Sequence, residues 1–324
     1  MGAVWARQAL LVAAAAFLCA GCTTGCATNR AIDRFYEGYE PGAPLNAAIV
    51  EEEDRETYRR VRFDFDGLPD QTVPSVMALP PEEGVYPAVI FLHGIGQRKE
   101  FLDEIAEPFV EAGFALVTFD QHDRGERRLD RRGPIRSALA LRRRTAWTVI
   151  ETRRLVDYLE TRDDIADGRV YLLGASYGAI TGATAAAFEE RIPAVVLTYG
   201  GGHLPTLFRT PEAREELGLL VYPMRLVAGL FFAPADPVHH IGAISPRPVL
   251  MQNGKHDTMI IPESAQRLYE AAKEPKEIIW YDSEHIGLDE EQVEDVIDDA
   301  IAWLAERDAE HREEAPSGGG EARL

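Results

Sequence analysis

A serine flanked by glycines is the residue of this chain best placed for nucleophilic chemistry. Residues 174–178 are Gly-Ala-Ser-Tyr-Gly, directly after the apolar residues 170–173 and before small residues that favour a helix from Ala179. A strand that turns sharply into a helix at such a G-x-S-x-G sequence holds its serine oxygen above the sheet. The start of the helix also favours negative charge near it. This context predicts that Ser176 is a nucleophile rather than an incidental serine in a glycine-rich turn.

A carboxylate and a histidine follow this serine in chain order, each directly after an apolar run. Residues 248–252 lead into a glycine-containing loop that carries Asp257, and residues 277–281 lead into a loop that carries His285. Reactive groups in open α/β sheets gather beyond the carboxyl ends of the strands, so both side chains are expected near Ser176. His285 would accept the serine proton, and Asp257 would fix the tautomer of its imidazole.

Each of these two assignments has a competing interpretation. Asp236 and Asp282 are alternative acids, and Asp257 could instead cap a helix that begins near Pro262. The corresponding alternative for His285 is an ordinary surface histidine.

The elements that must position these residues alternate along the middle of the chain. Short apolar runs and longer helical patterns follow one another, which is typical of a mainly parallel sheet with helices on both faces. A turn-rich spacer at residues 67–70 predicts that the first two strands are antiparallel. The expected fold class is therefore α/β, with a mixed sheet of about eight strands. The expected strands are residues 60–65, 75–79, 88–92, 115–119, 170–173, 194–198, 249–252 and 277–281, and the expected helices are 100–111, 140–160, 179–189, 263–272 and 290–306.

The order of these motifs resembles the α/β-hydrolase superfamily, in particular its dienelactone hydrolases, acyl esterases and prolyl-oligopeptidase-like domains. The resemblance covers residues 58–307 and rests on an oxyanion loop, a serine, an acid and a histidine in that order. It implies an α/β-hydrolase fold and a serine esterase that needs no cofactor and acts on a small-molecule ester. A serine peptidase of the prolyl-oligopeptidase-like type and a non-catalytic binding module are the alternative functions.

Two further loops resemble parts of the same superfamily. Residues 93–96, His-Gly-Ile-Gly, resemble its oxyanion loop, which implies that the backbone amides of Ile95 and Tyr177 stabilise the tetrahedral intermediate. His93 is expected to order this loop rather than to act in catalysis. Residues 120–125, Asp-Gln-His-Asp-Arg-Gly, resemble the loop that packs beside it, and we expect a structural role for them.

Composition excludes several other kinds of site. The three cysteines all lie near the N-terminus, so the folded body has neither a disulfide nor a thiolate metal site. His239 and His240 lack a matching ligand cluster, so no metal is expected. A formal net charge of -20 argues against a nucleic-acid partner. The arginine-rich residues 124–144 could recognise an acidic substrate, but salt bridges to local carboxylates such as Glu126 and Asp130 are the favoured interpretation.

The N-terminus has the pattern of an export signal. Residues 1–21 contain Arg7, an apolar run and a small-residue end. Residues 18–22, Leu-Cys-Ala-Gly-Cys, resemble the lipobox of bacterial lipoproteins, which implies lipidation of Cys22 and anchorage at the periplasmic or outer surface of a bacterial membrane. Cys19 occupies the place of the usual apolar residue, so a soluble secreted protein is the alternative.

The expected organisation is a signal peptide at residues 1–21, a tether at 22–57, a catalytic domain at 58–307 and a disordered tail at 308–324. An insertion at about 200–241 interrupts the catalytic domain. Its apolar run, residues 217–232, is too short and interrupted to cross a bilayer, so it forms either a lid or a buried helical insertion. A lid carrying Phe231 and Phe232 predicts a small pocket and short acyl groups. The oligomeric state is not assigned.

Overall fold

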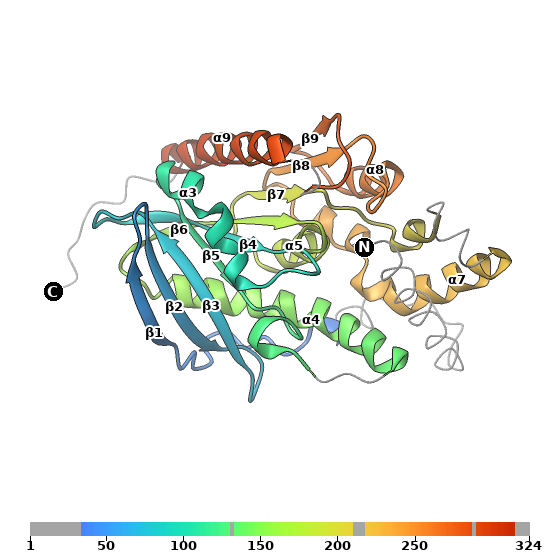
Figure 1. Cartoon of the computed structure of the whole chain (residues 1–324), viewed down its shortest axis with the longest axis horizontal. Coiled ribbons are helices and arrows are strands. Elements are labelled where there is room, and N and C mark those ends of the chain that lie inside the picture. Colours follow the sequence, from blue (N-terminus) through green and yellow to red (C-terminus); the bar gives the residue numbers. More distant parts are fainter. Residues whose placement is uncertain (1–33, 130–132, 210–217, 287–289, 315–324) are drawn as a thin grey trace.

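A mixed sheet forms the centre of the protein in the computed structural model, which describes residues 34–129, 133–209, 218–286 and 290–314 (Figure 1). Within these residues the sheet has nine strands in the order β1-β2-β3-β5-β4-β6-β7-β8-β9. Strands β1, β2, β3 and β5 pair antiparallel, and all pairs from β5 through β4 to β9 are parallel. The strands are β1 Ala48–Asp54, β2 Arg59–Asp66, β3 Thr72–Leu79, β4 Tyr86–Leu92, β5 Ala115–Phe119, β6 Ile165–Ala175, β7 Val195–Thr198, β8 Val249–Gly254 and β9 Lys276–Tyr281.

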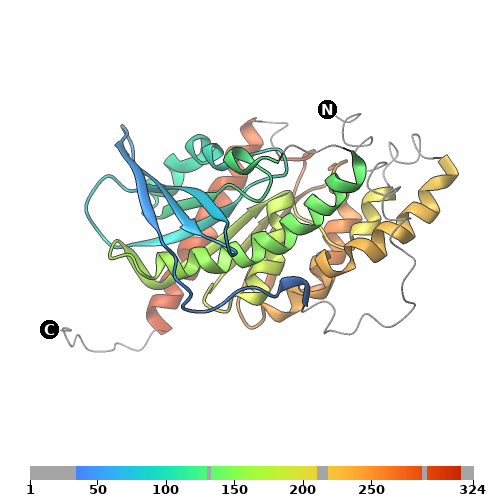
Figure 2. The ribbon, with the colours of Figure 1, turned by 90° about the horizontal axis from the view of Figure 1, so that it is seen from below.

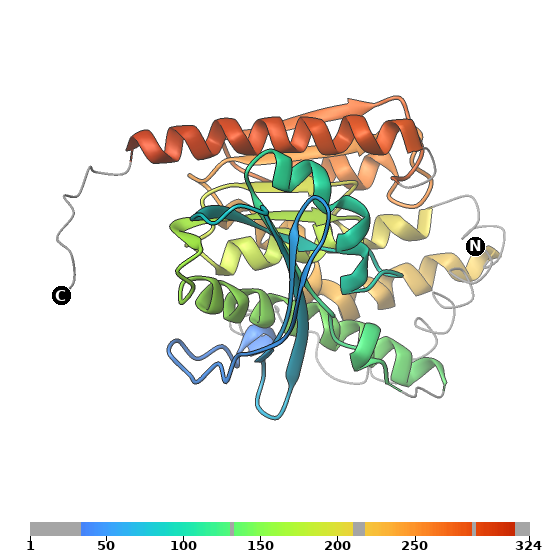
Figure 3. The ribbon, with the colours of Figure 1, turned by 60° about the vertical axis from the view of Figure 1, so that its left-hand side comes forward.

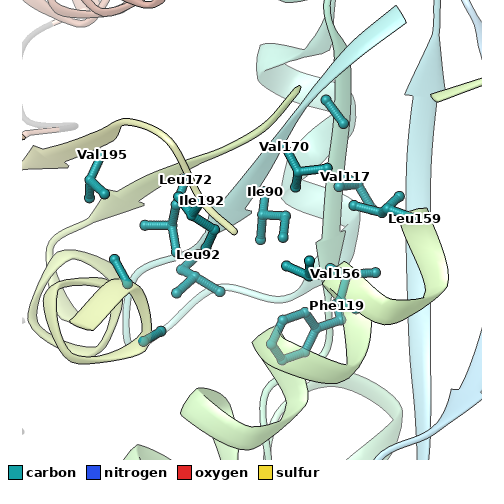
Figure 4. Packing of buried hydrophobic residues seen from close by; sticks show 14 of the residues in the cluster. Ile90, Leu92, Val117, Phe119, Val156, Leu159, Val170, Leu172, Ile192 and Val195 are labelled. Carbon is teal, nitrogen blue, oxygen red and sulfur yellow. The ribbon is translucent and has the colours of Figure 1, made fainter. Parts of the chain in front are cut away.

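Helices cover both faces of this sheet, and its central strands are therefore buried on both sides. Ile90 and Leu92 of β4 point into one core, which α4 covers with Val156 and Leu159 (Figure 4). Alternate residues of the same strand point into the second core, under α3 and α9. The longer helices are α3 Leu102–Glu111, α4 Pro134–Leu159, α5 Tyr177–Phe188, α7 Val221–Phe232, α8 Pro262–Ala271 and α9 Glu290–Glu314.

The sequence predicted every strand of this sheet except β1, which lies inside the expected tether. The prediction of a tether is therefore wrong for this part of residues 22–57. All seven residues of β1 are exposed, so the strand has no apolar alternation that could reveal it. Its acidic residues instead lie opposite arginines of β2, with Glu53 paired to Arg60 and Asp54 to Arg59. Opposite charges across an antiparallel pair stabilise it.

The C-terminal boundary also differs from the prediction of a disordered tail from residue 308. Helix α9 continues to Glu314, and Asp308 is buried in it. The carboxylate of Asp308 accepts two hydrogen bonds of 2.7 Å from Arg169 and one of 2.9 Å from the Tyr171 hydroxyl. This partly buried ion pair fixes the helix against β6. Residues 315–324, like the expected signal peptide and Cys22, lie outside the described residues.

Short helices fill the interval between β7 and β8 where an insertion was expected. They are η4 Leu204–Arg209, η5 Gly218–Leu220, η6 Ala233–Ala235, η7 Pro237–His239 and η8 Ile241–Ala243, with α7 among them. Helix α7 and the first half of α4 project from the end of the molecule opposite the last turns of α9 (Figure 3). Among the helices that the structure describes, none is long and apolar enough to cross a membrane.

Candidate active site

Ser176 lies in the sharp turn between β6 and α5. Its backbone angles, φ 55° and ψ -116°, are ones that a residue with a side chain rarely adopts. The backbone amide of Ser176 donates to the Thr198 carbonyl oxygen of β7 at 2.8 Å, which fixes the turn to the sheet. Strain of this kind persists only where the surrounding structure enforces it, and it leaves the serine side chain half-exposed above the sheet.

The flanking glycines are required by close backbone contacts. A Cβ on Gly178 would lie 1.7 Å from the Leu92 carbonyl oxygen, and a Cβ on Gly174 would lie 2.4 Å from the Gly178 carbonyl oxygen. Backbone atoms cannot move aside as a flexible side chain can. The G-x-S-x-G sequence thus allows α5 to approach β4 and β6 closely enough to form the turn.

The three predicted triad residues form one hydrogen-bonded chain. The Oγ of Ser176 lies 2.9 Å from Nε2 of His285, and Nδ1 of His285 lies 2.7 Å from Oδ2 of Asp257. These contacts fit a neutral imidazole that donates from Nδ1 to the carboxylate and accepts from the serine hydroxyl at Nε2. His285 and Asp257 are both buried, whereas Ser176 remains accessible.

Asp257 is fixed by the loop that carries it. Its Oδ1 accepts from the amides of Met259 and Ile260, both at 2.8 Å, which leaves Oδ2 for His285. The residue does not cap α8, whose N-cap is Ile261 without a side-chain hydrogen bond.

The two competing aspartates have other partners. Asp236 accepts from the amides of His203 and Leu204, at 2.8 and 2.7 Å, and thereby ties together two loops of the insertion. Asp282 is exposed and contacts His256 at 2.8 Å.

Tyr199 supports His285 and was not singled out by the sequence. Its ring meets the imidazole edge-on, with the ring centres 5.7 Å apart, and its hydroxyl hydrogen-bonds to Ser283 in the histidine loop. The residue directly follows β7 and has a φ of 50°. A single tyrosine after a strand does not indicate that its φ is positive. The sequence therefore offered no signal for this contact.

The loop expected to form the oxyanion hole lies beside the serine. An added Cβ on Gly94 would be 3.7 Å from Cβ of Ser176. Nδ1 of His93 donates to the Gly94 carbonyl oxygen at 2.9 Å, and burial lowers the pKa of His93 to about 4, so the ring stays neutral and orders the loop. Tyr177 is the first residue of α5, and its amide therefore has no acceptor within the helix.

Residues 120–125 hold that loop in place, as the sequence predicts. The side-chain amide of Gln121 donates to the His93 carbonyl oxygen at 3.0 Å, and Nε of Arg124 donates to the Ile95 carbonyl oxygen. Two side chains from one loop thus fix the backbone on both sides of Gly94, which keeps the Ile95 amide in a set orientation.

Comparison with known proteins agrees with this architecture. Residues 87–221 match the family model described as the alpha/beta hydrolase fold. The chain has the α/β-hydrolase fold. Acetyl xylan esterase from Paenibacillus sp. R4 is similar in structure, with a TM-score of 0.66, 17% identity and coverage of 87% of this chain and 95% of that one. Acetyl xylan esterase 1 from Thermoanaerobacterium sp. JW/SL YS485 has a TM-score of 0.65 and 18% identity, and the match covers 87% of this chain and 94% of that one.

Two curated bacterial proteins are similar to this chain in sequence. Esterase YjfP of Escherichia coli K12 is 25% identical over 203 residues, which cover 58% of this chain and 75% of that protein. Putative hydrolase YtaP of Bacillus subtilis 168 is 22% identical over 235 residues, which cover 68% of this chain and 76% of that protein. The esterases among these relatives support the expectation of a carboxylic-ester hydrolase.

Described residues of the arginine-rich stretch 124–144 form both local and distant salt bridges. Arg124 lies 3.9 Å from the neighbouring Asp123, whereas Glu126 and Arg127 pair with other elements. Glu126 pairs with Arg62 of β2 and with Lys99, at 2.8 and 2.6 Å, rather than with a neighbouring arginine. Arg127 makes a buried bidentate contact of 2.6 and 2.9 Å with Glu151 of α4. Asp130 lies outside the described residues.

Two later arginines of this stretch stack on aromatic rings. The guanidinium of Arg142 lies 4.9 Å from the ring centre of Phe35 and 5.0 Å from that of Phe231. Arg144 lies 4.3 Å from the ring centre of Tyr177, whose hydroxyl contacts Thr145 at 2.9 Å. These contacts tie α4 to η1 Arg34–Tyr36, to α7 and to the residue that follows the nucleophile.

The part of the chain that the structure describes contains no group of three or more His, Cys, Asp or Glu residues arranged to hold a metal ion. His240 is buried and contacts the Pro234 carbonyl oxygen at 3.0 Å, while its neighbour His239 is exposed.

Proposed function

We propose that this protein is a serine hydrolase that cleaves carboxylic esters. The observation that carries the proposal is the hydrogen-bonded chain from Ser176 through His285 to Asp257, formed at a strained turn above the sheet. Side chains in this geometry can activate a serine hydroxyl, because the histidine accepts its proton while the buried carboxylate stabilises the imidazolium. The named esterases among the relatives favour esters over other acyl compounds.

In the acylation step, Oγ of Ser176 attacks the ester carbonyl carbon and its proton passes to Nε2 of His285. Negative charge develops on the carbonyl oxygen, where the amides of Ile95 and Tyr177 would donate to it. The tetrahedral intermediate then collapses, the bond to the alcohol oxygen breaks, and His285 returns the proton to the leaving alcohol.

Hydrolysis of the acyl-enzyme repeats these roles with water. His285 removes a proton from water, the resulting hydroxide adds to the acyl carbon, and the carboxylic acid leaves as Ser176 regains its proton. The same groups therefore serve both halves of the reaction.

Short acyl groups are the substrates that we propose. The names of two structurally similar enzymes specify acetyl esters, and the insertion of this chain places two adjacent phenylalanines at the end of α7. Their bulk would leave little room for a long chain.

The direct test is Ser176→Ala. This change should abolish labelling by a fluorophosphonate probe and lower turnover of p-nitrophenyl acetate by about five to six orders of magnitude, because it removes the atom that forms the acyl-enzyme. His285→Ala should lower turnover about as far, since triad members act as a unit. Both variants should keep the wild-type circular dichroism spectrum. Undiminished turnover in folded Ser176→Ala protein would refute the proposal.

We further propose that the protein is exported and lipidated at Cys22, on the lipobox-like residues 18–22. More than one acyl chain would hold it stably at a membrane surface. Cys22→Ser should move the protein from the membrane pellet to the soluble fraction of a bacterium that processes lipoproteins, as fractionation and immunoblotting would measure. Cys19→Ser is the matched control and should remain in the pellet. Equal partitioning of both variants and wild type would contradict acylation at Cys22.

A further inference from the structure

One face of α7 exposes large apolar side chains. Leu219, Tyr222, Leu226 and Leu230 are between 63% and 84% exposed. Their spacing of three, four and four residues places them along one side of the helix and of η5 before it. We call these four residues the α7 stripe.

The opposite side of α7 packs against the protein. Val221 and Val227 are buried there, and Phe231 and Phe232 are half-buried in edge-to-face contact at 4.9 Å. The helix therefore has apolar residues on both sides, and among its large apolar side chains that the structure describes those of the α7 stripe are the most exposed. Three residues of the α7 stripe, Tyr222, Leu226 and Leu230, also line an open groove of about 390 Å³ against His203 and Pro205.

The first half of α4 and helix α7 both lack acidic residues. The whole chain has a formal net charge of -20, yet residues 133–150 and 218–235 contain no acidic residue and carry five arginines. Arg136 and Arg143 are exposed on α4, with the exposed Leu139 between them on the same face. The first half of α4 and α7 lie side by side, joined where Arg142 stacks on Phe231 (Figure 2).

The first described residues of the chain lie at this same end. The Tyr36 hydroxyl donates to the Pro234 carbonyl oxygen at 2.8 Å, directly after α7. Eleven residues lie between Cys22 and Arg34, so an anchor at Cys22 would be at most about 40 Å from η1. An anchored protein would thus carry the end that bears α7 close to the bilayer.

We infer that the α7 stripe, flanked by Arg136 and Arg143, is a docking surface for a membrane that contains anionic phospholipids. The leucines and the tyrosine would enter the boundary between headgroups and acyl chains, and the arginines would contact lipid phosphates. Tyr177, the first residue of α5, directly follows Ser176 and stacks on Arg144 of α4, so docking would turn the candidate active site toward the bilayer.

Charge favours a membrane over a second copy of this chain. A two-fold interface through the same surface would bring Arg136 and Arg143 of both copies together without any acidic residue of residues 133–150 or 218–235 to pair with them. An anionic bilayer supplies that negative charge.

Vesicle sedimentation of the full exported chain with Cys22→Ser tests the inference, because this form lacks the expected acylation site. It should bind vesicles of phosphatidylcholine with about 30% phosphatidylglycerol at least about tenfold more strongly than phosphatidylcholine alone. Adding Leu226→Asn/Leu230→Asn should weaken binding to both vesicles by about tenfold or more. Adding Arg136→Glu/Arg143→Glu should weaken binding to the anionic vesicles by about tenfold or more and leave the neutral ones unaffected.

Matched controls separate this surface from general effects of polarity and charge. Ile49→Asn/Val50→Asn removes two exposed apolar residues from β1, and Arg267→Glu/Arg312→Glu makes the same charge change on exposed arginines of α8 and α9. Neither control should change vesicle binding, and all variants should keep the thermal unfolding midpoint of the parent.

Three results would overturn the inference: no vesicle binding by the parent, equal losses in the control variants, or a dimer that Leu226→Asn/Leu230→Asn converts to a monomer without any change in vesicle binding. No turnover enters these measurements, so their failure leaves the proposed esterase activity untouched.

Discussion

Asp257 receives two backbone hydrogen bonds at one carboxylate oxygen, and this decides what the other oxygen does. Because the amides of Met259 and Ile260 occupy Oδ1, Oδ2 is directed at Nδ1 of His285. The carboxylate therefore holds the histidine proton on Nδ1 and leaves Nε2 free to accept from Ser176.

Asp257→Asn should lower kcat for p-nitrophenyl acetate by about four orders of magnitude. An asparagine can still accept from the two amides through its carbonyl oxygen, so its NH2 group would face His285 and force the ring proton onto Nε2. The histidine could then no longer accept the serine proton. Steady-state kinetics at neutral pH, with circular dichroism as the fold check, measures the effect.

The competing acids supply the controls for this prediction. Asp282→Asn should leave kcat within about a factor of two, since its exposed contact with His256 contributes little. Asp236→Asn should lower the unfolding midpoint more than kcat, because its carboxylate ties two loops of the insertion. If Asp236→Asn lowered kcat strongly and Asp257→Asn did not, the assignment of Asp257 as the triad acid would be wrong.

At the scale of elements, α7 is where substrate choice is expected to be decided. Its last two residues, Phe231 and Phe232, are half-buried and contact each other, and Arg142 of α4 stacks on Phe231. The end of α7 is thus fixed by packing against α4 instead of lying loose over the protein. Fixed bulky side chains can limit the length of an acyl group.

Phe231→Ala/Phe232→Ala should shift the preference of the enzyme toward longer acyl chains. The wild type should turn over p-nitrophenyl butyrate faster than the palmitate, whereas in an open pocket each productively bound methylene would add about 0.8 kcal/mol and favour the palmitate. The butyrate-to-palmitate ratio of kcat/KM should fall by about tenfold or more in the double variant. Ile49→Ala/Val50→Ala should leave it unchanged. A wild type that prefers palmitate would show that these phenylalanines do not limit the pocket.

At the scale of the whole molecule, buried histidines make stability depend on pH. His122 is buried edge-on against Trp147, with ring centres 4.0 Å apart, and burial followed by the nearby Arg127 lowers its pKa from 6.5 to about 4. Between these two pH values the unfolded chain binds a proton that the folded chain does not. Stability conferred by neutral His122 is therefore complete above pH 6.5 and is lost as the pH falls toward 4.

His122→Phe should make the free energy of unfolding less sensitive to acid. The variant keeps an aromatic ring against Trp147 and removes the titrating group, so its loss of stability between pH 6.5 and 4 should be smaller than that of wild type by about 2 kcal/mol. Urea denaturation across this pH range measures the difference. The exposed His256 provides the control, and His256→Phe should retain the wild-type pH dependence. If the free energy of unfolding fell equally with pH in wild type and His122→Phe, the prediction would be contradicted.

Local chemistry in the sequence was sufficient to identify much of this protein. Eight strands of the sheet have apolar runs because each is at least partly covered, and this signal does not depend on what packs against them. Gly174 is needed for a turn formed within a few residues, where an added Cβ would meet the Gly178 backbone, so the sequence around Ser176 indicates much of its own geometry. The order of Asp257 and His285 after separate strands then indicated the partners of the serine.

Tertiary structure decided the features that depend on residues far apart in the chain. Strand β1 has no buried face, and only the register that places its acidic residues against the arginines of β2 makes it a strand. The salt-bridge partners of Glu126 and Arg127 come from β2, Lys99 and α4 rather than from their neighbours. Which side of α7 is buried also depended on packing, because an apolar helix carries no periodic signal to show which of its faces meets the core.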